Sequence, residues 1–317
     1  MKKIYAIEEV NGGGLKKYID DLRVYYDIKK ITNKEELLQI TDDDVLLVQN
    51  LLFTDIEITN LLKIKNIIIT IHDWYWMHEY VMKKFFDDHF PPIHTNYLRK
   101  NIKIDENIIK LFNHAKKIVH STPFTYNHYK KYFKEDNFVI IPHIDYKLNF
   151  NNHVIPKIIN NEINIGILHS LNQPKGEELV HYLMENVVNY KNYKINYLIT
   201  KKQLFYDEQK DFYELIQENN IHGTTLLNIW GETYCYALTK IINAGIPIIY
   251  NNIGSFKYRI NVKNQHYFIF SQDENGVYNF ELLKLEFEKM LDCIILNNGI
   301  NIYENIKEII NNYSVIL

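Results

Sequence analysis

The sequence is poor in cysteine, glycine and proline, and each shortage excludes a class of protein. Among 317 residues there are two cysteines, Cys235 and Cys293, which cannot build a disulfide framework and have no metal-ligand spacing. With 11 glycines and 7 prolines, collagen-like repeats and low-complexity arrays are excluded as the main architecture. The composition is that of an ordinary globular protein, which we expect in a reducing compartment.

Long apolar runs and an excess of one charge are also missing. The longest interior apolar run, 67–71, contains Thr70 and is far shorter than the roughly 20 residues of a membrane-spanning helix. The apolar run near the amino terminus is broken at Glu8 and Glu9, which is unlike a signal peptide. Lys and Arg number 36 against 39 Asp and Glu, a net charge of −3 that favours neither nucleic acid nor an anionic membrane as a partner. We therefore expect a soluble, cytoplasmic protein.

Short apolar runs alternate with helical patterns along the chain, which is typical of βαβ units and parallel sheets. Leu15, Tyr18, Ile19 and Leu22 have helical spacing, and a second helix is predicted at 106–115. Strands are predicted at 3–7, 44–48, 66–71, 117–120 and 138–141, and again at 163–168, 195–199, 225–228, 246–250 and 267–270.

The length and a polar stretch at 149–161 indicate two domains. We predict two Rossmann-like parallel-sheet domains, 1–150 and 151–317, that face each other across a cleft, with the last helix able to pack back on the first domain. Ligands of open α/β sheets bind beyond the carboxyl ends of the strands. A segment of about thirty residues after the third strand exceeds the usual ~2–6 for such loops and is a candidate substrate-contacting insertion.

Two segments of the first half carry residues suited to ligand binding. Asn11–Gly14 lies between a strand and a helix, where glycine permits close backbone approach and the helix N-terminus offers N–H groups to a diphosphate. It matches neither a P-loop nor Gly-x-Gly-x-x-Gly, which disfavours ATP hydrolysis and NAD binding, and the alternative is a plain tight turn. His72 follows a buried strand, where it would face the cleft or, alternatively, be hydrogen-bonded inside a loop.

The second half repeats this arrangement. Lys175 precedes Gly176 at a predicted helix start, where a lysine can hold a phosphate as a point charge, although most lysines are simply solvated. Glu232 is predicted to open a helix on the cleft side, where a carboxylate is favoured by the helix dipole or binds sugar hydroxyls. The core stripe of that helix would be Tyr234, Ala237, Leu238 and Ile241.

These motifs, taken in order, resemble family 4 glycosyltransferases of GT-B fold, in particular the glycosyl transferase group 1 domains of bacterial surface-polysaccharide assembly. The resemblance rests on Gly-Gly-Gly before the first helix, His-Asp after the third strand and Lys-Gly opening the second domain. It continues with Glu-Thr-Tyr-x-Tyr, Ala-Gly-x-Pro and Ile-Gly-Ser-Phe, so that it covers nearly the whole chain.

The resemblance implies a retaining, metal-independent transfer of a hexosyl-type sugar from a nucleotide-diphospho-sugar to a glycan or other hydroxyl acceptor, without a cofactor. Gly13, Gly14 and Lys175 would contact the donor diphosphate, His72 would lie beside the reacting sugar, and Glu232 would bind sugar hydroxyls. His72, Glu232 and Lys175 are therefore the predicted catalytic residues. Further donor contacts are predicted for His169, Ser170, Thr233, Lys240 and Gly254.

Two departures from the family pattern keep alternatives open. Lys240 stands where the second Glu of the Glu-x7-Glu motif normally holds the ribose, and an expected Arg is absent near His169 and Ser170. A catalytically weak GT-B-like module that binds a glycan or a partner glycosyltransferase is therefore the main alternative, and a nucleotide-sugar epimerase of the same shape is another. We favour the enzyme because the other motif residues are present.

Overall fold

The computed structural model describes residues 3–7, 13–51, 54–72, 75–77, 104–143, 156–168, 171–199, 209–260, 267–271 and 277–298. They form two compact units. Unit 1 comprises the described residues of Met1–Pro91 and Tyr97–Tyr146 together with Glu232–Tyr234, and unit 2 comprises those of Lys147–Gly231 and Cys235–Leu317. The predicted boundary between residues 150 and 151 lies outside the described residues, as do residues 78–103 of the predicted insertion and the C-terminal 299–317.

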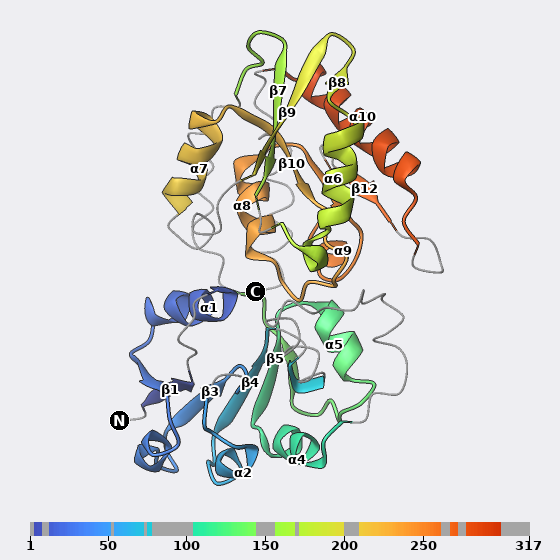
Figure 1. Cartoon of the computed structure of the whole chain (residues 1–317). Helices are drawn as coiled ribbons and strands as arrows, with labels where there is room; N and C mark the ends of the chain where they lie inside the picture. The colour runs from blue at the N-terminus through green and yellow to red at the C-terminus, as the bar shows by residue number, and fades with distance from the viewer. Residues whose placement is uncertain are drawn as a thin grey trace. The chain divides into compact units, whose positions relative to one another are not determined.

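Unit 1 is built on a six-stranded sheet with the order β2-β1-β3-β4-β5-β6, in which all neighbours are parallel (Figure 1). The strands are β1 (Ile4–Ile7), β2 (Ile28–Ile31), β3 (Val45–Val48), β4 (Ile67–Ile71), β5 (Lys117–His120) and β6 (Phe138–Ile140). The strand order reverses between β1 and β3, which makes that point the topological switch of the sheet. The described helices are α1 (Gly13–Arg23), the 3₁₀ turn η1 (Glu36–Gln39), α2 (Ile58–Leu61), α4 (Glu106–His114) and α5 (Pro123–Tyr129).

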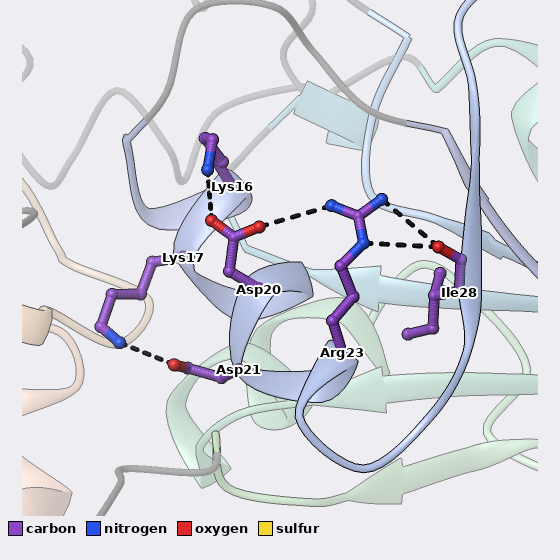
Figure 2. A network of polar contacts seen from close by, with 6 residues as sticks. All are labelled: Lys16, Lys17, Asp20, Asp21, Arg23 and Ile28. Atoms are coloured by element: carbon purple, nitrogen blue, oxygen red, sulfur yellow. Dashed lines mark hydrogen bonds and ion pairs between the residues drawn. The ribbon is translucent and has the colours of Figure 1, made fainter.

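Helix α1 is fastened to the following strand by a chain of charged groups (Figure 2). The ammonium of Lys16 contacts the carboxylate of Asp20, one turn further along, and Arg23 Nη1 donates to the other oxygen of that carboxylate at 3.4 Å. Arg23 also donates from Nε to the carbonyl of Ile28, at the start of β2, at 3.3 Å. Exposed pairs of this kind contribute only about 0.3–0.5 kcal/mol each, so their effect is chiefly to orient the helix.

Unit 2 contains a second six-stranded sheet, with the order β12-β11-β10-β7-β9-β8, whose switch point lies between β7 and β10. Its strands are β7 (Glu162–Ile167), β8 (Asn189–Tyr190), β9 (Tyr193–Ile199), β10 (Ile221–Leu226), β11 (Ile248–Asn251) and β12 (Tyr267–Phe270). Only the β8–β9 pair among the described strands is antiparallel. The helices are the 3₁₀ turn η4 (Gln173–Lys175), α6 (Glu177–Asn186), α7 (Gln209–Glu218), α8 (Tyr236–Ala244), α9 (Phe256–Arg259) and α10 (Phe280–Leu296).

Both faces of the second sheet are covered by helices, which explains why its strands β10 and β11 are buried along their whole length. Successive residues of a strand point to opposite faces, and β11 shows the consequence. Ile249 packs in the cluster formed with α6 and α10, whereas Ile248 and Tyr250 pack in the cluster formed with α7 and α8. Figure 1 shows these two helix pairs on either side of the sheet. Unit 2 is therefore a three-layer α/β/α sandwich.

The predicted α/β class with two parallel sheets is confirmed, and most strand boundaries differ by one or two residues. The strand predicted at 225–228 covers Ile221–Leu226 instead, because buried His222 can sit within it by accepting a hydrogen bond at Nδ1 from the Asn164 N–H at 2.9 Å. The prediction missed β2, an edge strand whose two middle lysines are exposed, and the two-residue β8. Within the described part of the chain, every helix is too short or too polar to cross a membrane.

Candidate functional site

In unit 1, the structure brings His72 next to a segment from far along the chain. His72 follows β4 at the carboxyl edge of the sheet, and the Thr233 hydroxyl donates a hydrogen bond to its backbone carbonyl across 161 positions of sequence. The Thr233 carbonyl accepts hydrogen bonds from the hydroxyls of Ser121 and Thr122, at 3.2 and 3.1 Å. Thr233 is thus fixed through both its side chain and its backbone, and its neighbour Glu232 is held in the same unit as His72.

The ring of His72 lies in a cluster of flat side chains. It stacks on His143, which follows β6, with ring centroids 4.5 Å apart and an interplanar angle of 17°. Tyr18 of α1 meets His72 edge-on at 4.5 Å, and Tyr234 meets His143 edge-on at 4.3 Å. Four chain segments therefore contribute to a single group of rings at the carboxyl edge of the first sheet.

His72, within this ring cluster, is uncharged at neutral pH. The Nε2 atom of His72 is buried, and no hydrogen-bond partner for it is present among the described residues. Burial lowers the pKa of His72 from 6.5 to about 3, so the imidazole is neutral. Burial also raises the pKa of the Tyr18 phenol, which shares a hydrogen bond with Thr70. A neutral imidazole can donate a hydrogen bond to a hydroxyl group or accept one from it, but it supplies no positive charge.

The predicted helix start at Glu232 is wrong. Helix α8 begins at Tyr236, and the residue before it, Cys235, has a left-handed backbone with φ of +70° and no side-chain cap. Glu232 is partly exposed in the loop before that helix. The reason is tertiary: the polar groups of Thr233 are engaged by His72 and by the β5–α5 turn, and Tyr234 contacts His143 instead of the α8 core. From the predicted core stripe, Leu238 and Ile241 are buried as expected.

In unit 2, Lys175 occupies the place that the sequence predicts. It ends the turn η4, and Gly176 follows with φ of +79° as the N-terminal cap of α6. A Cβ atom at Gly176 would lie 2.0 Å from the carbonyl oxygen of Leu227, so only glycine fits. The turn that carries Lys175 therefore touches the end of β10, where the loop toward Glu232 begins. Asn172 accepts a hydrogen bond from the Lys175 N–H at 3.3 Å and caps the turn.

The first helix of unit 1 matches this arrangement only in part. Gly13 and Gly14 are the first two residues of α1, so they form its first turn and not a loop before it. Both α1 and η4–α6 follow the first strand of their sheet, β1 and β7 respectively, at the switch point. The predicted repetition of one strand–helix arrangement in both halves is thus present in the topology.

Lys240 lies on α8, whereas Glu232 precedes that helix. The Lys240 side chain is buried, at 7% exposure, and its ammonium lies 5.8 Å from the centroid of the Phe212 ring on α7. The expectation that both residues share one helix is therefore wrong. Gly254 lies in the turn before α9 with φ of +61°.

Two residues that sequence reasoning missed hold the loop on either side of Glu232 in unit 2. The amide of Asn251, at the end of β11, donates to the carbonyl of Asn228 at 2.9 Å. Arg259 of α9 donates to the carbonyl of Cys235 at 2.8 Å and to the Thr239 hydroxyl at 2.5 Å, and so braces the uncapped start of α8. The place of Asn251 at the end of a predicted strand could have indicated its role, whereas no local sequence pattern distinguishes Arg259.

Two predicted site residues, His169 and Ser170, lie outside the described residues. Among the residues that are described, no group of three or more His, Cys, Asp or Glu side chains is arranged to hold a metal ion.

Neither a family model nor a curated protein sequence matches this chain. Solved structures do match it. HepE of Anabaena, in complex with UDP, has a TM-score of 0.57 at 10% identity over 99% of this chain and 100% of that chain. Sucrose-phosphate synthase from Thermosynechococcus elongatus has a TM-score of 0.56 at 8% identity, covering 98% and 94%. The pneumococcal O-GlcNAc transferase GtfA, with UDP and GlcNAc, has a TM-score of 0.53 at 11% identity, covering 89% of this chain and 58% of that chain.

These similarities establish the fold. The chain has the α/β architecture with two Rossmann-like domains of GT-B glycosyltransferases, as the sequence predicts. Membership of family 4 stays a prediction.

Proposed function

We propose that this protein is a retaining glycosyltransferase that moves a sugar from a nucleotide-diphospho-sugar to a glycan or other hydroxyl acceptor. The observation that carries the proposal is the hydrogen bond from Thr233 to the His72 carbonyl. It joins the segment of Glu232, the proposed sugar-hydroxyl ligand, to the histidine proposed to act beside the reacting sugar. The GT-B fold over almost the whole chain supports the same conclusion, and HepE was solved with UDP-glucose.

The roles follow from the chemistry of each group. Lys175 supplies positive charge to the donor diphosphate beside the start of α6, and Gly13 and Gly14 offer backbone N–H groups at the start of α1. His169, Ser170, Thr233 and Gly254 are proposed as further donor contacts, whereas the buried Lys240 ammonium lies over the Phe212 ring. His72 is neutral, so we assign it a hydrogen bond to the transferred sugar or the acceptor hydroxyl and not a charge interaction.

In the proposed reaction, the acceptor hydroxyl attacks the anomeric carbon on the face that the leaving diphosphate departs from. The new glycosidic bond forms as the bond between the anomeric carbon and the diphosphate oxygen breaks. The leaving phosphate takes the proton of the acceptor hydroxyl. The protein contributes position and electrostatic stabilisation of the phosphate, for which no metal ion is required.

Donor screening by thermal shift tests the proposal, because a ligand that binds only the folded state raises its melting temperature. UDP-glucose and UDP-GlcNAc are the first probes, followed by ADP- and GDP-sugars. Product analysis by NMR with the stabilising donor then reports transfer and anomeric configuration. Inverted product would overturn retention, and donor binding without transfer to any of a panel of glycan acceptors would support the module without catalysis.

A further inference from the structure

The ring of His143 stacks on that of His72, with centroids 4.5 Å apart. His143 lies just after β6, is 5% exposed, and presents its ring face to that of His72. Tyr18 touches both imidazoles, at 4.5 Å from His72 and 4.7 Å from His143. Two histidines that follow different strands and one tyrosine from a helix thus form a compact three-ring group.

Packing is what fixes the orientation of the His72 ring. The χ2 torsion of histidine joins an sp³ to an sp² carbon, so its intrinsic preference is broad and roughly two-fold. The buried Nε2 of His72 has no hydrogen-bond partner among the described residues that would select one ring orientation. A flat ring stacked at an interplanar angle of 17° and a tyrosine edge at 63° restrict rotation instead.

The ring of His143 also contacts the Glu232 segment. Tyr234, two residues after Glu232, meets the His143 ring edge-on, with centroids 4.3 Å apart and an interplanar angle of 62°. The Thr233 hydroxyl also donates a hydrogen bond to the His72 carbonyl, so the Glu232 segment contacts both His143 and His72. His143 therefore touches both segments that carry proposed catalytic residues in unit 1.

We propose that His143 is a positioning residue that sets the orientation of the His72 ring by stacking on it. This inference rests on the proposed function, in which His72 acts beside the transferred sugar. The ring face of His143 performs this task, so a flat apolar ring in its place preserves it. A misplacement of about 1 Å in a reacting group can reduce turnover roughly 100-fold, which sets the scale of the expected effect.

Three variants at one position test the mechanism in the full chain: His143→Phe, His143→Leu and His143→Ala. We expect H143F to retain kcat to within about threefold, and H143L and H143A to lose about 10- to 100-fold in kcat with the KM for the donor nearly unchanged. His120→Phe is the matched control, because His120 is also a fully buried imidazole among aromatic rings of unit 1, and it contacts Tyr129 and Phe138 instead. H120F should keep full kcat.

The NMR signal of the His72 ring Cε1–H gives a readout that needs no activity. We expect a single sharp signal in wild type and H143F and a displaced or broadened signal in H143L. The leucine side chain fills much of the volume of the histidine ring, so H143L serves as the test variant if H143A does not fold. Equal activity in H143L and wild type, or a folded H143F as inactive as H143L, overturns the inference. Full activity in His72→Ala would instead overturn the role of His72 in the proposed function, whatever the His143 variants do.

Discussion

The side chain of Thr233 and the backbone of His72 are joined by a hydrogen bond in which the Thr233 hydroxyl is the donor. Thr233 is buried, at 5% exposure. The contact ties a loop that precedes α8 to the end of β4. It is the link on which the proposed assembly of Glu232 and His72 depends.

Thr233→Val should destabilise unit 1 and lower transfer. Valine matches threonine in shape but leaves the His72 carbonyl unsatisfied, which costs about 1–3 kcal/mol in the free energy of unfolding. Urea denaturation measures the loss. Thr233→Ser keeps the donor and is the matched control, with a smaller loss of about 0.8 kcal/mol for one methyl group. Equal losses in the two variants would show that packing, and not the hydrogen bond, holds the loop.

Glu232→Gln and Glu232→Ala should abolish most donor-dependent transfer and leave the free energy of unfolding nearly unchanged. Glu232 is partly exposed and stands outside the buried α8 core, so its truncation opens no core cavity. Steady-state kinetics with the identified donor, alongside thermal melts, gives both quantities. Full activity in either variant, or gross unfolding of both, would refute a donor-binding role.

Transfer should survive EDTA. In the proposed mechanism Lys175 and helix N-termini perform the electrostatic task that a divalent ion performs in metal-dependent transferases. Initial rates measured after dialysis against EDTA should equal those in untreated enzyme. An activity that disappears on dialysis and returns in proportion to added Mn²⁺ or Mg²⁺ would contradict the metal-independent mechanism.

Lys240→Met should leave donor affinity unchanged, because the ammonium lies over Phe212 within unit 2. Methionine keeps the aliphatic stem and removes the charge. Lys240→Glu, by contrast, should lower the free energy of unfolding by about 1–3 kcal/mol, since it puts a carboxylate against the negative face of a buried ring. Calorimetry with a nucleoside diphosphate measures the affinity. Weaker binding by K240M would mean that Lys240 reaches the donor, as the family resemblance implies.

The stability of the protein should fall as the pH is lowered below about 6.5. Burial lowers the pKa of His120 from 6.5 to about 3, so the unfolded chain binds a proton in this range before the folded protein does. This contribution is complete above pH 6.5 and is lost toward pH 3. His120→Phe should therefore reduce the pH dependence between pH 6 and 4 by about 1.4 kcal/mol per pH unit. An unchanged slope in denaturation curves would show that His120 is protonated in the folded state.

The sequence by itself determined the fold class and most of the elements. The apolar run of β4 and the helical spacing around Ile19 of α1 are local patterns, and their apolar residues are buried in the folded protein. The turn at Lys175 and Gly176 was also predictable, because a glycine before a helix start marks a backbone that other residues cannot adopt. Edge strands escaped prediction, since the middle lysines of β2 need no burial.

The tertiary structure alone decided how the candidate site is assembled. Nothing local to Glu232 shows that the helix after it begins only at Tyr236, because the hydrogen bonds that hold Thr233 come from Ser121 and Thr122. The stacking of His72 on His143 likewise arises from the folding of two strands onto one sheet edge. Spacing along the chain encodes elements, whereas contacts between distant residues depend on how those elements pack, and it is these contacts that fix the ring of His72 and the place of Glu232.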